Sequence, residues 1–259
     1  MPYANNQDIR IHYRVEGEGP PLVLQHGFSS TLQTWYDYGY VDALQQDYHL
    51  LLLDARGHGA SDKPHEPEAY DLERRVGDIV AVLDQENIAQ AHYLGYSMGG
   101  WIGYGVAKYA PERFQSLIIG GSIPYARSTE GQRQILRTGI EEGLDAFMSD
   151  MEKTFGPLEP KLKAQILAND LKALLALTQD RPSLESVLPT MQMPCLLYVG
   201  EADSFCSGLE ACAQHIPNVT FVSLPGLDHI QGMERSDLVL PHVTTFLNTV
   251  SHGVQTAGS

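Results

Sequence analysis

Six short runs of apolar residues recur along the chain and predict buried strands. They lie at residues 22–24, 50–53, 92–94, 117–119, 196–199 and 219–222. Runs without polar alternation are typical of parallel strands that are covered on both faces. Residues 9–15 instead alternate apolar and polar positions, which predicts a half-buried strand near a sheet edge. Asn5 and Asn6 before this strand predict a turn.

Helical patterns separate these runs. Residues 72–85 carry apolar side chains at a spacing of about 3.6 residues, which is typical of a helix with one buried face. Residues 101–109 and 238–250 are also predicted to be helical. Strands that alternate with helices predict an α/β protein with a largely parallel sheet.

One long segment, residues 125–188, interrupts this alternation. Its helical patterns lie at residues 132–140, 144–155, 162–167 and 171–177. We predict that this segment is a helical cap, or lid, over the carboxyl edge of the sheet, where ligands bind in open α/β sheets. Residues 1–124 and 189–259 would then form the core domain. Ordinary crossover helices are the alternative, but the segment is long for that role.

The most informative motif is Gly-Tyr-Ser-Met-Gly-Gly at residues 95–100, between a predicted strand and a predicted helix. A serine in this setting is typical of a nucleophile elbow, a tight turn that lifts one hydroxyl clear of the sheet. Glycine is needed on both sides because the turn brings backbones too close for a Cβ atom. The motif predicts Ser97 as a nucleophile.

A serine nucleophile needs a histidine to take its proton and a carboxylate to orient that histidine. In this topology the chain order is serine, acid, histidine. Asp203 follows one predicted strand and His229 follows the next, so we predict Ser97, Asp203 and His229 as catalytic residues. Glu201 competes with Asp203 for the role of the acid.

The rest of the predicted site is built from loops and aromatic residues. Two backbone N–H groups must hold the oxyanion of a tetrahedral intermediate, and we assign them to Phe28 and Met98. The predicted substrate pocket contains Trp35, Tyr36, Trp101, Tyr125, Phe147 and Met151. His26 and His58 lie in glycine-rich turns and are predicted to make structural hydrogen bonds.

The loop at residues 54–62 is predicted to support the active site. Arg56 within this loop offers a second interpretation, a cation that binds substrate.

Composition narrows the range of partners. The chain has 259 residues, with 17 basic and 32 acidic side chains and a formal net charge of −15. This charge disfavours nucleic acids and anionic membrane surfaces as partners, and favours neutral substrates. No stretch approaches the roughly 20 apolar residues that span a bilayer. Three cysteines without metal-ligand spacing predict free thiols and a cytoplasmic protein. We expect no metal and no cofactor, and a monomer or a homodimer.

Five segments together resemble the α/β-hydrolase superfamily. They are His26-Gly27-Phe28, the loop at 54–61, and the motifs at 95–100, 200–203 and 226–229. The resemblance covers nearly the whole chain and identifies it as similar to serine esterases with a small helical cap. It implies an α/β-hydrolase fold, with a mostly parallel eight-stranded sheet flanked by helices and a cap inserted after the sixth strand. It also assigns the nucleophile, acid and base to Ser97, Asp203 and His229.

The expected activity is hydrolysis of carboxylic esters with small to medium acyl or aryl groups, through an acyl-enzyme intermediate. A lactonase, or a hydrolase of carbon–carbon bonds in β-diketones, would use the same three residues. A ring-cleavage substrate with a carboxylate would need a cation in the pocket. The cap offers Arg127, Arg133, Arg137, Lys153, Lys161, Lys163, Lys172 and Arg181. A ligand-binding signalling protein on the same fold is the alternative of another class.

Overall fold

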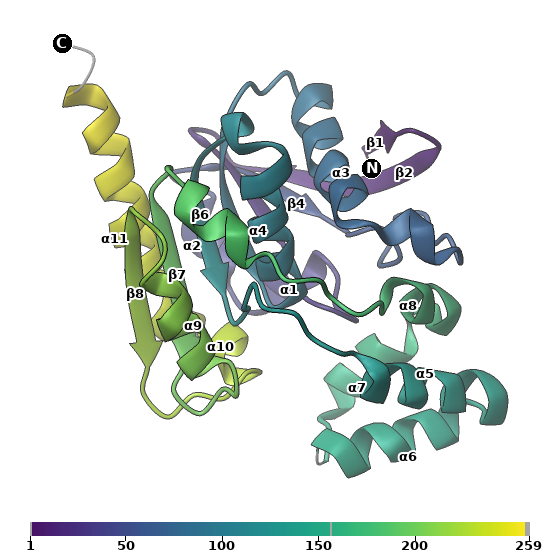
Figure 1. The fold of residues 1–259 in the computed structure, drawn as a ribbon. Coiled ribbons are helices and arrows are strands. Elements are labelled where there is room, and N and C mark those ends of the chain that lie inside the picture. The colour runs from purple at the N-terminus through teal and green to yellow at the C-terminus, as the bar shows by residue number, and fades with distance from the viewer. Residues whose placement is uncertain (1, 156, 257–259) are drawn as a thin grey trace.

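The computed structural model describes residues 2–155 and 157–256, and its centre is one eight-stranded sheet (Figure 1). The strands are β1 (Tyr3–Asn6), β2 (Ile9–Glu16), β3 (Pro21–Gln25), β4 (His49–Leu53), β5 (Ala91–Tyr96), β6 (Phe114–Gly120), β7 (Cys195–Gly200) and β8 (Val219–Leu224). Their spatial order is β1-β2-β4-β3-β5-β6-β7-β8. The predicted eight-stranded, mostly parallel sheet is confirmed.

The strands from β3 to β8 pair in parallel, whereas β1 and β2 are antiparallel to their neighbours. The predicted turn at Asn5 and Asn6 is wrong, because both residues belong to β1 and pair with Arg10 and Ile9 of β2. The turn comes later, at Gln7, whose φ is 56°. Pairing with β2 gives the backbone of the two asparagines hydrogen-bond partners that a turn would leave to water.

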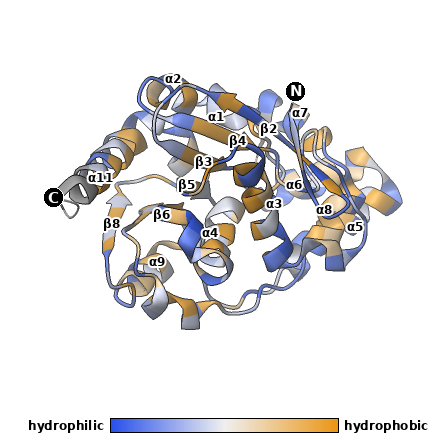
Figure 2. Ribbon diagram, turned by 90° about the horizontal axis from the view of Figure 1, so that it is seen from above, coloured by the Kyte–Doolittle hydropathy of each residue, from blue (hydrophilic) through white to orange (hydrophobic). Residues whose placement is uncertain are grey.

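Helices cover both faces of the sheet, as the view from above in Figure 2 shows. On one face lie α1 (Gln33–Asp37), α2 (Tyr40–Leu44) and α11 (Ser236–Thr256). On the other lie α3 (Leu72–Gln85), α4 (Met98–Tyr109) and α9 (Cys206–Ala213). Successive strand side chains point to opposite faces, so Leu22 and Leu24 join the first core and Val23 joins the second.

The described part of the chain that connects β6 to β7 contains four α-helices, which form a group at one end of the sheet in Figure 1. They are α5 (Glu130–Glu142), α6 (Leu144–Phe155), α7 (Pro160–Leu167) and α8 (Leu171–Leu177). The chain segments that enter and leave this helical group pair with each other: the Arg127 amide donates to the Arg181 carbonyl at 3.0 Å, and the reverse bond is 2.9 Å. This pairing fixes the two connections side by side.

Shorter helices complete the fold at η1 (Pro67–Tyr70), η2 (Pro111–Arg113), η3 (Glu185–Thr190) and α10 (Gln231–Glu234). Cys195, Cys206 and Cys212 are free thiols. Within the described ranges, every helix is too short or too polar to traverse a lipid bilayer.

Candidate active site

The turn between β5 and α4 holds Ser97 in a strained backbone conformation. Its φ is 54° and its ψ is −109°, which L-residues rarely adopt. A Cβ atom on Gly95 would lie 2.4 Å from the Gly99 carbonyl oxygen, and one on Gly99 would lie 2.0 Å from the carbonyl oxygen of Gln25. The two flanking glycines therefore permit a turn that any side chain would obstruct.

Three side chains from distant parts of the chain form a hydrogen-bonded series. The Nε2 atom of His229 lies 2.9 Å from Ser97 Oγ, and its Nδ1 atom lies 2.6 Å from Asp203 Oδ2. In a tautomer with the proton on Nδ1, His229 donates to the carboxylate and offers Nε2 to the serine hydroxyl. The arrangement can thus take a proton from Ser97.

The surroundings of His229 fix its orientation. The second oxygen of Asp203 accepts the Phe205 amide at 2.9 Å, and the Asp203 side chain is only 1% exposed. The Tyr96 hydroxyl donates to the carbonyl of His229 at 2.6 Å, and the Phe205 ring stands edge-on to the imidazole. Glu201, the competing acid, is exposed and lies 3.4 Å from the Ser223 hydroxyl. The structure therefore brings Asp203, and not Glu201, to the histidine.

The loop after β3 runs directly beside the serine. A Cβ atom on Gly27 would lie 3.4 Å from Ser97 Cβ, so the next residue, Phe28, starts close to the hydroxyl. Met98 is the first residue of α4, where helix N–H groups lack intrahelical acceptors. Among the described residues, the backbone N–H groups of Phe28 and Met98 have no hydrogen-bond acceptor. Both predicted oxyanion donors thus lie on the two segments that flank Ser97.

A buried carboxylate ties this loop to the one after β4. Asp54 accepts the Leu32 amide and the Ala60 amide, each at 2.9 Å, and lies 2.7 Å from Nδ1 of His12. Asp54 is 3% exposed. The loop at residues 54–62 therefore supports the segment that contains Phe28.

His26 and His58 make structural hydrogen bonds in the same region. The Ala55 amide lies 3.0 Å from His26 Nε2, and the Ser29 amide lies 3.2 Å from His58 Nε2. Each imidazole accepts through Nε2, so each is neutral in this arrangement. Burial lowers the pKa of both groups, and the neighbouring His26 lowers that of His58 further. These neutral rings hold the two loops together.

Arg56 lies in the interior and not at the site. Its guanidinium makes a two-point ion pair with Asp78, at 2.6 Å from Nε and 2.5 Å from Nη2. It also donates to the carbonyls of Ala69 and Arg74. These bonds anchor the supporting loop to α3, which gives Arg56 a structural position.

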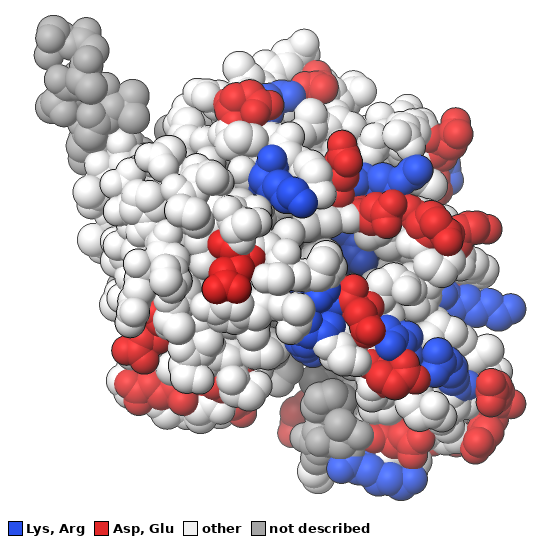
Figure 3. Space-filling view, in the orientation of Figure 1, with Lys and Arg blue, Asp and Glu red and all other residues white. Residues whose placement is uncertain are grey.

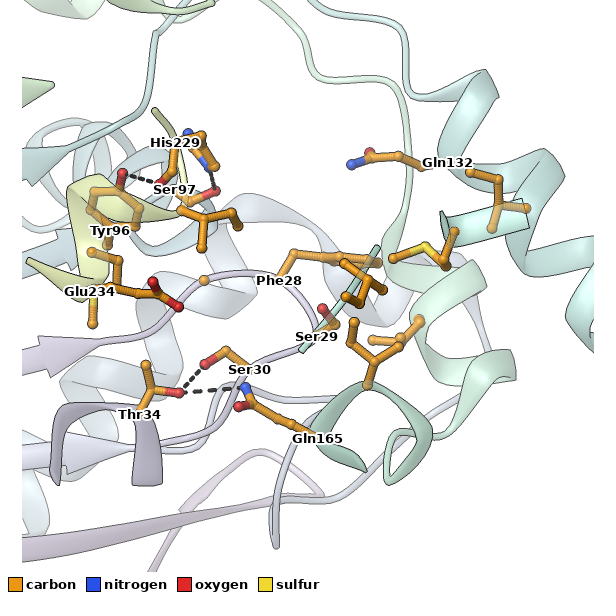
Figure 4. A pocket seen from close by; sticks show the side chains of 18 of the residues that line it. Phe28, Ser29, Ser30, Thr34, Tyr96, Ser97, Gln132, Gln165, His229 and Glu234 are labelled. Atoms are coloured by element: carbon orange, nitrogen blue, oxygen red, sulfur yellow. Dashed lines mark hydrogen bonds between the residues drawn. The ribbon is translucent and has the colours of Figure 1, made fainter. Parts of the chain in front are cut away.

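A cavity of about 340 Å³ opens above Ser97, between the sheet edge and the helices α5 to α8 (Figure 4). Apolar side chains form most of its wall. They are Phe28, Ile135, Leu136, Phe147, Met151, Leu158, Ile166, Leu174, Ile230 and Met233. Among its polar lining residues, Thr34 is hydrogen-bonded to both Ser30 and Gln165 (Figure 4).

Of the six predicted pocket residues, Phe147 and Met151 line this cavity, and the other four lie elsewhere. Trp35 is fully buried against Tyr40, and the Tyr36 hydroxyl donates to Glu16. Trp101 lies beneath the guanidinium groups of two arginines, and Tyr125 packs against the core near α9. Aromatic type alone does not indicate which face of an element reaches the cavity.

Sequence reasoning missed most of the aliphatic lining from the helices between β6 and β7. Ile135 and Leu136 on α5 face the cavity together with Leu174 of α8. The amphipathic pattern of α5 could have indicated such a face. Glu234, at the end of α10, also lines the cavity, and no sequence motif includes it.

Most of the basic residues at 125–188 that were candidates for binding a substrate carboxylate form ion pairs with acidic side chains of the protein. Arg133 and Arg137 pair with Glu130, and Lys161 pairs with Asp37. Figure 3 shows basic and acidic side chains interspersed over this part of the surface.

The two arginines of the paired connections lie over aromatic rings. Arg181 is 4.9 Å from the ring centre of Trp101, and Arg127 is 5.0 Å from that of Phe205. Burial, together with the nearby cations of Arg75 and Arg127, lowers the pKa of Arg181 to about 9. Neither Arg127 nor Arg181 is among the described residues that line the cavity.

The family described as alpha/beta hydrolase fold matches residues 20–192. This chain belongs to that family. It is 28% identical, over 93% of its length and 96% of the relative's, to a protein of Bacillus subtilis (strain 168) provisionally named 2-succinyl-6-hydroxy-2,4-cyclohexadiene-1-carboxylate synthase. It is also 28% identical to 3-oxoadipate enol-lactonase 2 of Acinetobacter baylyi, over 88% of this chain and 90% of that protein.

Solved structures agree with this family membership. The enol-lactonase from Burkholderia xenovorans LB400 superposes with a TM-score of 0.83 at 25% identity, covering 95% of this chain and all of that one. A hydrolase from Pseudomonas aeruginosa PA01 superposes with a TM-score of 0.84 at 26% identity, over 95% and 97% of the two chains. The shared architecture therefore extends over nearly the whole protein.

Proposed function

We propose that this protein is a serine hydrolase that cleaves carboxylic esters with small to medium acyl or aryl groups. The observation that carries the proposal is the series Ser97–His229–Asp203 at the base of an apolar cavity. Such a series activates a serine hydroxyl toward a carbonyl carbon. Ser97 would be the nucleophile, His229 the base, and Asp203 the carboxylate that orients and stabilises this base.

The first half of the reaction would form an acyl-enzyme. Ser97 Oγ attacks the ester carbonyl carbon while Nε2 of His229 takes its proton, and Asp203 stabilises the imidazolium. The amides of Phe28 and Met98 would hold the oxyanion, helped by the N-terminal end of α4. The intermediate then collapses, the bond from the carbonyl carbon to the alkoxy oxygen breaks, and His229 returns the proton to the leaving alcohol.

The second half would release the acid by the same route. A water molecule attacks the acyl carbon and gives a proton to His229. The bond between the acyl carbon and Ser97 Oγ breaks, and the serine regains its proton from His229. The free carboxylic acid leaves and the enzyme is restored.

The helices α5 to α8 would act as the cap that selects the acyl group. Their contribution to the cavity wall is mostly aliphatic and aromatic, including Leu136, Phe147 and Ile166. Each methylene group that a substrate buries there would contribute about 0.8 kcal/mol. Pockets for small ligands have volumes of about 300–1,000 Å³ and mostly apolar walls. The cavity of about 340 Å³ is at the small end of this range, which favours esters of small to medium size.

A lactone is the second candidate substrate. Two similar proteins are named as enol-lactonases, from Acinetobacter baylyi and Burkholderia xenovorans. A lactone is a cyclic ester, so the same attack by Ser97 opens it and leaves the alcohol attached to the acyl group. A substrate with a free carboxylate is less favoured, because Arg127 and Arg181 lie outside the described cavity lining.

Hydrolysis of p-nitrophenyl acetate and p-nitrophenyl butyrate tests the proposal, with γ-butyrolactone as the lactone arm. Wild type should turn over the esters, and Ser97→Ala should lose at least about 10³-fold in kcat. Equal inactivity of wild type and Ser97→Ala on a broad panel of esters and lactones, together with binding of a small molecule, would establish a ligand-binding protein instead.

A further inference from the structure

The cavity is asymmetric in charge. Among the described lining residues, Glu234 is the one with a carboxylate, and neither lysine nor arginine lines the wall. Glu234 is exposed at the end of α10. The Tyr38 hydroxyl donates to its Oε1 atom at 3.0 Å. A carboxylate held at the wall of an otherwise neutral cavity gives one end of the cavity a negative potential.

Two cations of neighbouring segments are paired with other carboxylates. Lys161 Nζ lies 3.0 Å from Asp37, and Arg235 makes a two-point pair with Asp237 at 2.8 and 2.7 Å. Burial and the adjacent Glu234 raise the pKa of Tyr38, so its hydroxyl remains a neutral donor. The Glu234 carboxylate therefore has a hydrogen bond but no described cationic partner.

The end of the cavity that holds Glu234 is the end where a leaving alcohol would lie. His229 would protonate the alcohol oxygen, so the alcohol must lie next to its imidazole. His229, Ile230, Met233 and Glu234 all line the cavity, and the amides of Met233 and Glu234 donate to the Ile230 carbonyl at 3.0 and 3.1 Å, so these residues belong to one short turn of the chain. Figure 4 shows His229 and Glu234 on the same side, opposite Gln132 of α5. The aliphatic wall of α5 to α8 would then face the acyl group.

We propose that Glu234 is a specificity-determining residue that selects esters of cationic or neutral alcohols and disfavours alcohols that carry a carboxylate. This inference rests on the proposed ester hydrolysis. An ammonium group on the alcohol gains attraction from Glu234, whereas a carboxylate is repelled by it. Glu234 would contact neither the scissile bond nor the hydrogen-bonded series Ser97–His229–Asp203. Its carboxylate would act on the alcohol part of the substrate through its charge.

A matched pair of substrates isolates this effect. Butyrylcholine carries a quaternary nitrogen, and 3,3-dimethylbutyl butyrate has the same shape with carbon in its place. The kcat/KM for butyrylcholine divided by that for 3,3-dimethylbutyl butyrate should fall about 5-fold in Glu234→Gln. This is the factor expected for the attraction between two unit charges about 4 Å apart in water. The kcat/KM of the neutral ester in each enzyme is the reference, so that any effect of the substitution on folding or on turnover of both esters cancels in the ratio.

Two controls separate local charge from net charge. Glu201→Gln removes an exposed carboxylate from the same edge of the sheet but outside the cavity lining, and it should leave the ratio within 2-fold of wild type. In 1 M NaCl the wild-type ratio should fall toward that of Glu234→Gln, because the Debye length shortens to about 3 Å. The butyrate ester of 3-hydroxypropanoic acid should respond in the opposite direction and become a better substrate for Glu234→Gln.

An unchanged ratio in Glu234→Gln would overturn the inference, provided that wild type hydrolyses the neutral ester and Ser97→Ala does not. That result would leave the proposed ester hydrolysis intact. Failure of wild type to hydrolyse any of the esters would overturn the proposed function, and this inference with it.

Discussion

Replacement of Asp203 by asparagine should abolish most of the activity while it preserves the shape of the site. One carboxylate oxygen faces His229 Nδ1 at 2.6 Å, and the other accepts the Phe205 amide at 2.9 Å. An asparagine has only one acceptor oxygen. If its NH₂ group faces His229, the ring proton must move to Nε2, and the imidazole can no longer accept the proton of Ser97.

The opposite orientation of the asparagine is also unfavourable. Its NH₂ group would then face the Phe205 amide, and two donors without an acceptor cost about 1–3 kcal/mol. The wrong tautomer is therefore favoured. We expect kcat for p-nitrophenyl butyrate to fall about 10⁴-fold. At 1.36 kcal/mol for each factor of ten, this corresponds to about 5.4 kcal/mol of lost transition-state stabilisation.

The assay is steady-state hydrolysis with urea unfolding of the same preparation, so that a loss of folded protein is recognised. Glu201→Gln is the matched control, because it removes an acid two residues away that lies outside the series, and its kcat should stay within 2-fold of wild type. A kcat for Asp203→Asn within tenfold of wild type, or an equal loss in Glu201→Gln, would refute the assignment of the acid.

Three further predictions concern the supporting loops and the cavity. Arg56→Met leaves the Asp78 carboxylate buried without its cation and should lower the free energy of unfolding by about 3–5 kcal/mol; urea unfolding measures this, and recovery in Arg56→Met/Asp78→Leu checks the cause. Because burial lowers the pKa of His26 and His58, the folded state binds protons less readily than the unfolded state, so stability should fall as the pH drops below about 6.5; denaturation at pH 7.5 and 5.5 tests this, and His58→Gln should reduce the slope. Phe147→Ala should raise the kcat/KM ratio of p-nitrophenyl hexanoate to acetate about 5-fold by lengthening the apolar end of the cavity; an unchanged ratio would place the acyl group elsewhere.

Several features of this protein were determined by local sequence. The strand runs at residues 22–24 and 50–53 are apolar on both faces because helices cover both sides of a parallel sheet. The position of Ser97 follows from Gly95 and Gly99, whose Cβ atoms would meet backbone oxygens within 2.4 Å. These are short-range steric requirements, so a few adjacent residues suffice to reveal them.

Chain order also predicted which side chains meet. The carboxyl ends of β5, β7 and the segment after β8 lie at one edge of the sheet because parallel strands point the same way. Asp203 and His229 follow such strands, and the structure places them within hydrogen-bond distance in series with Ser97. The choice between Asp203 and Glu201 needed the structure, because the two residues are only two positions apart.

The tertiary structure alone decided what surrounds that series. Trp35, Trp101 and Phe147 are all buried aromatic residues, but of these three only Phe147 lines the cavity, because packing between elements determines which side of each element is covered. Arg56 is paired with Asp78 in the interior, and Glu234 lines the cavity, although neither residue lies in a distinctive sequence pattern. Local sequence fixes backbone conformation within a few residues, whereas the lining of a cavity depends on contacts between segments more than a hundred residues apart.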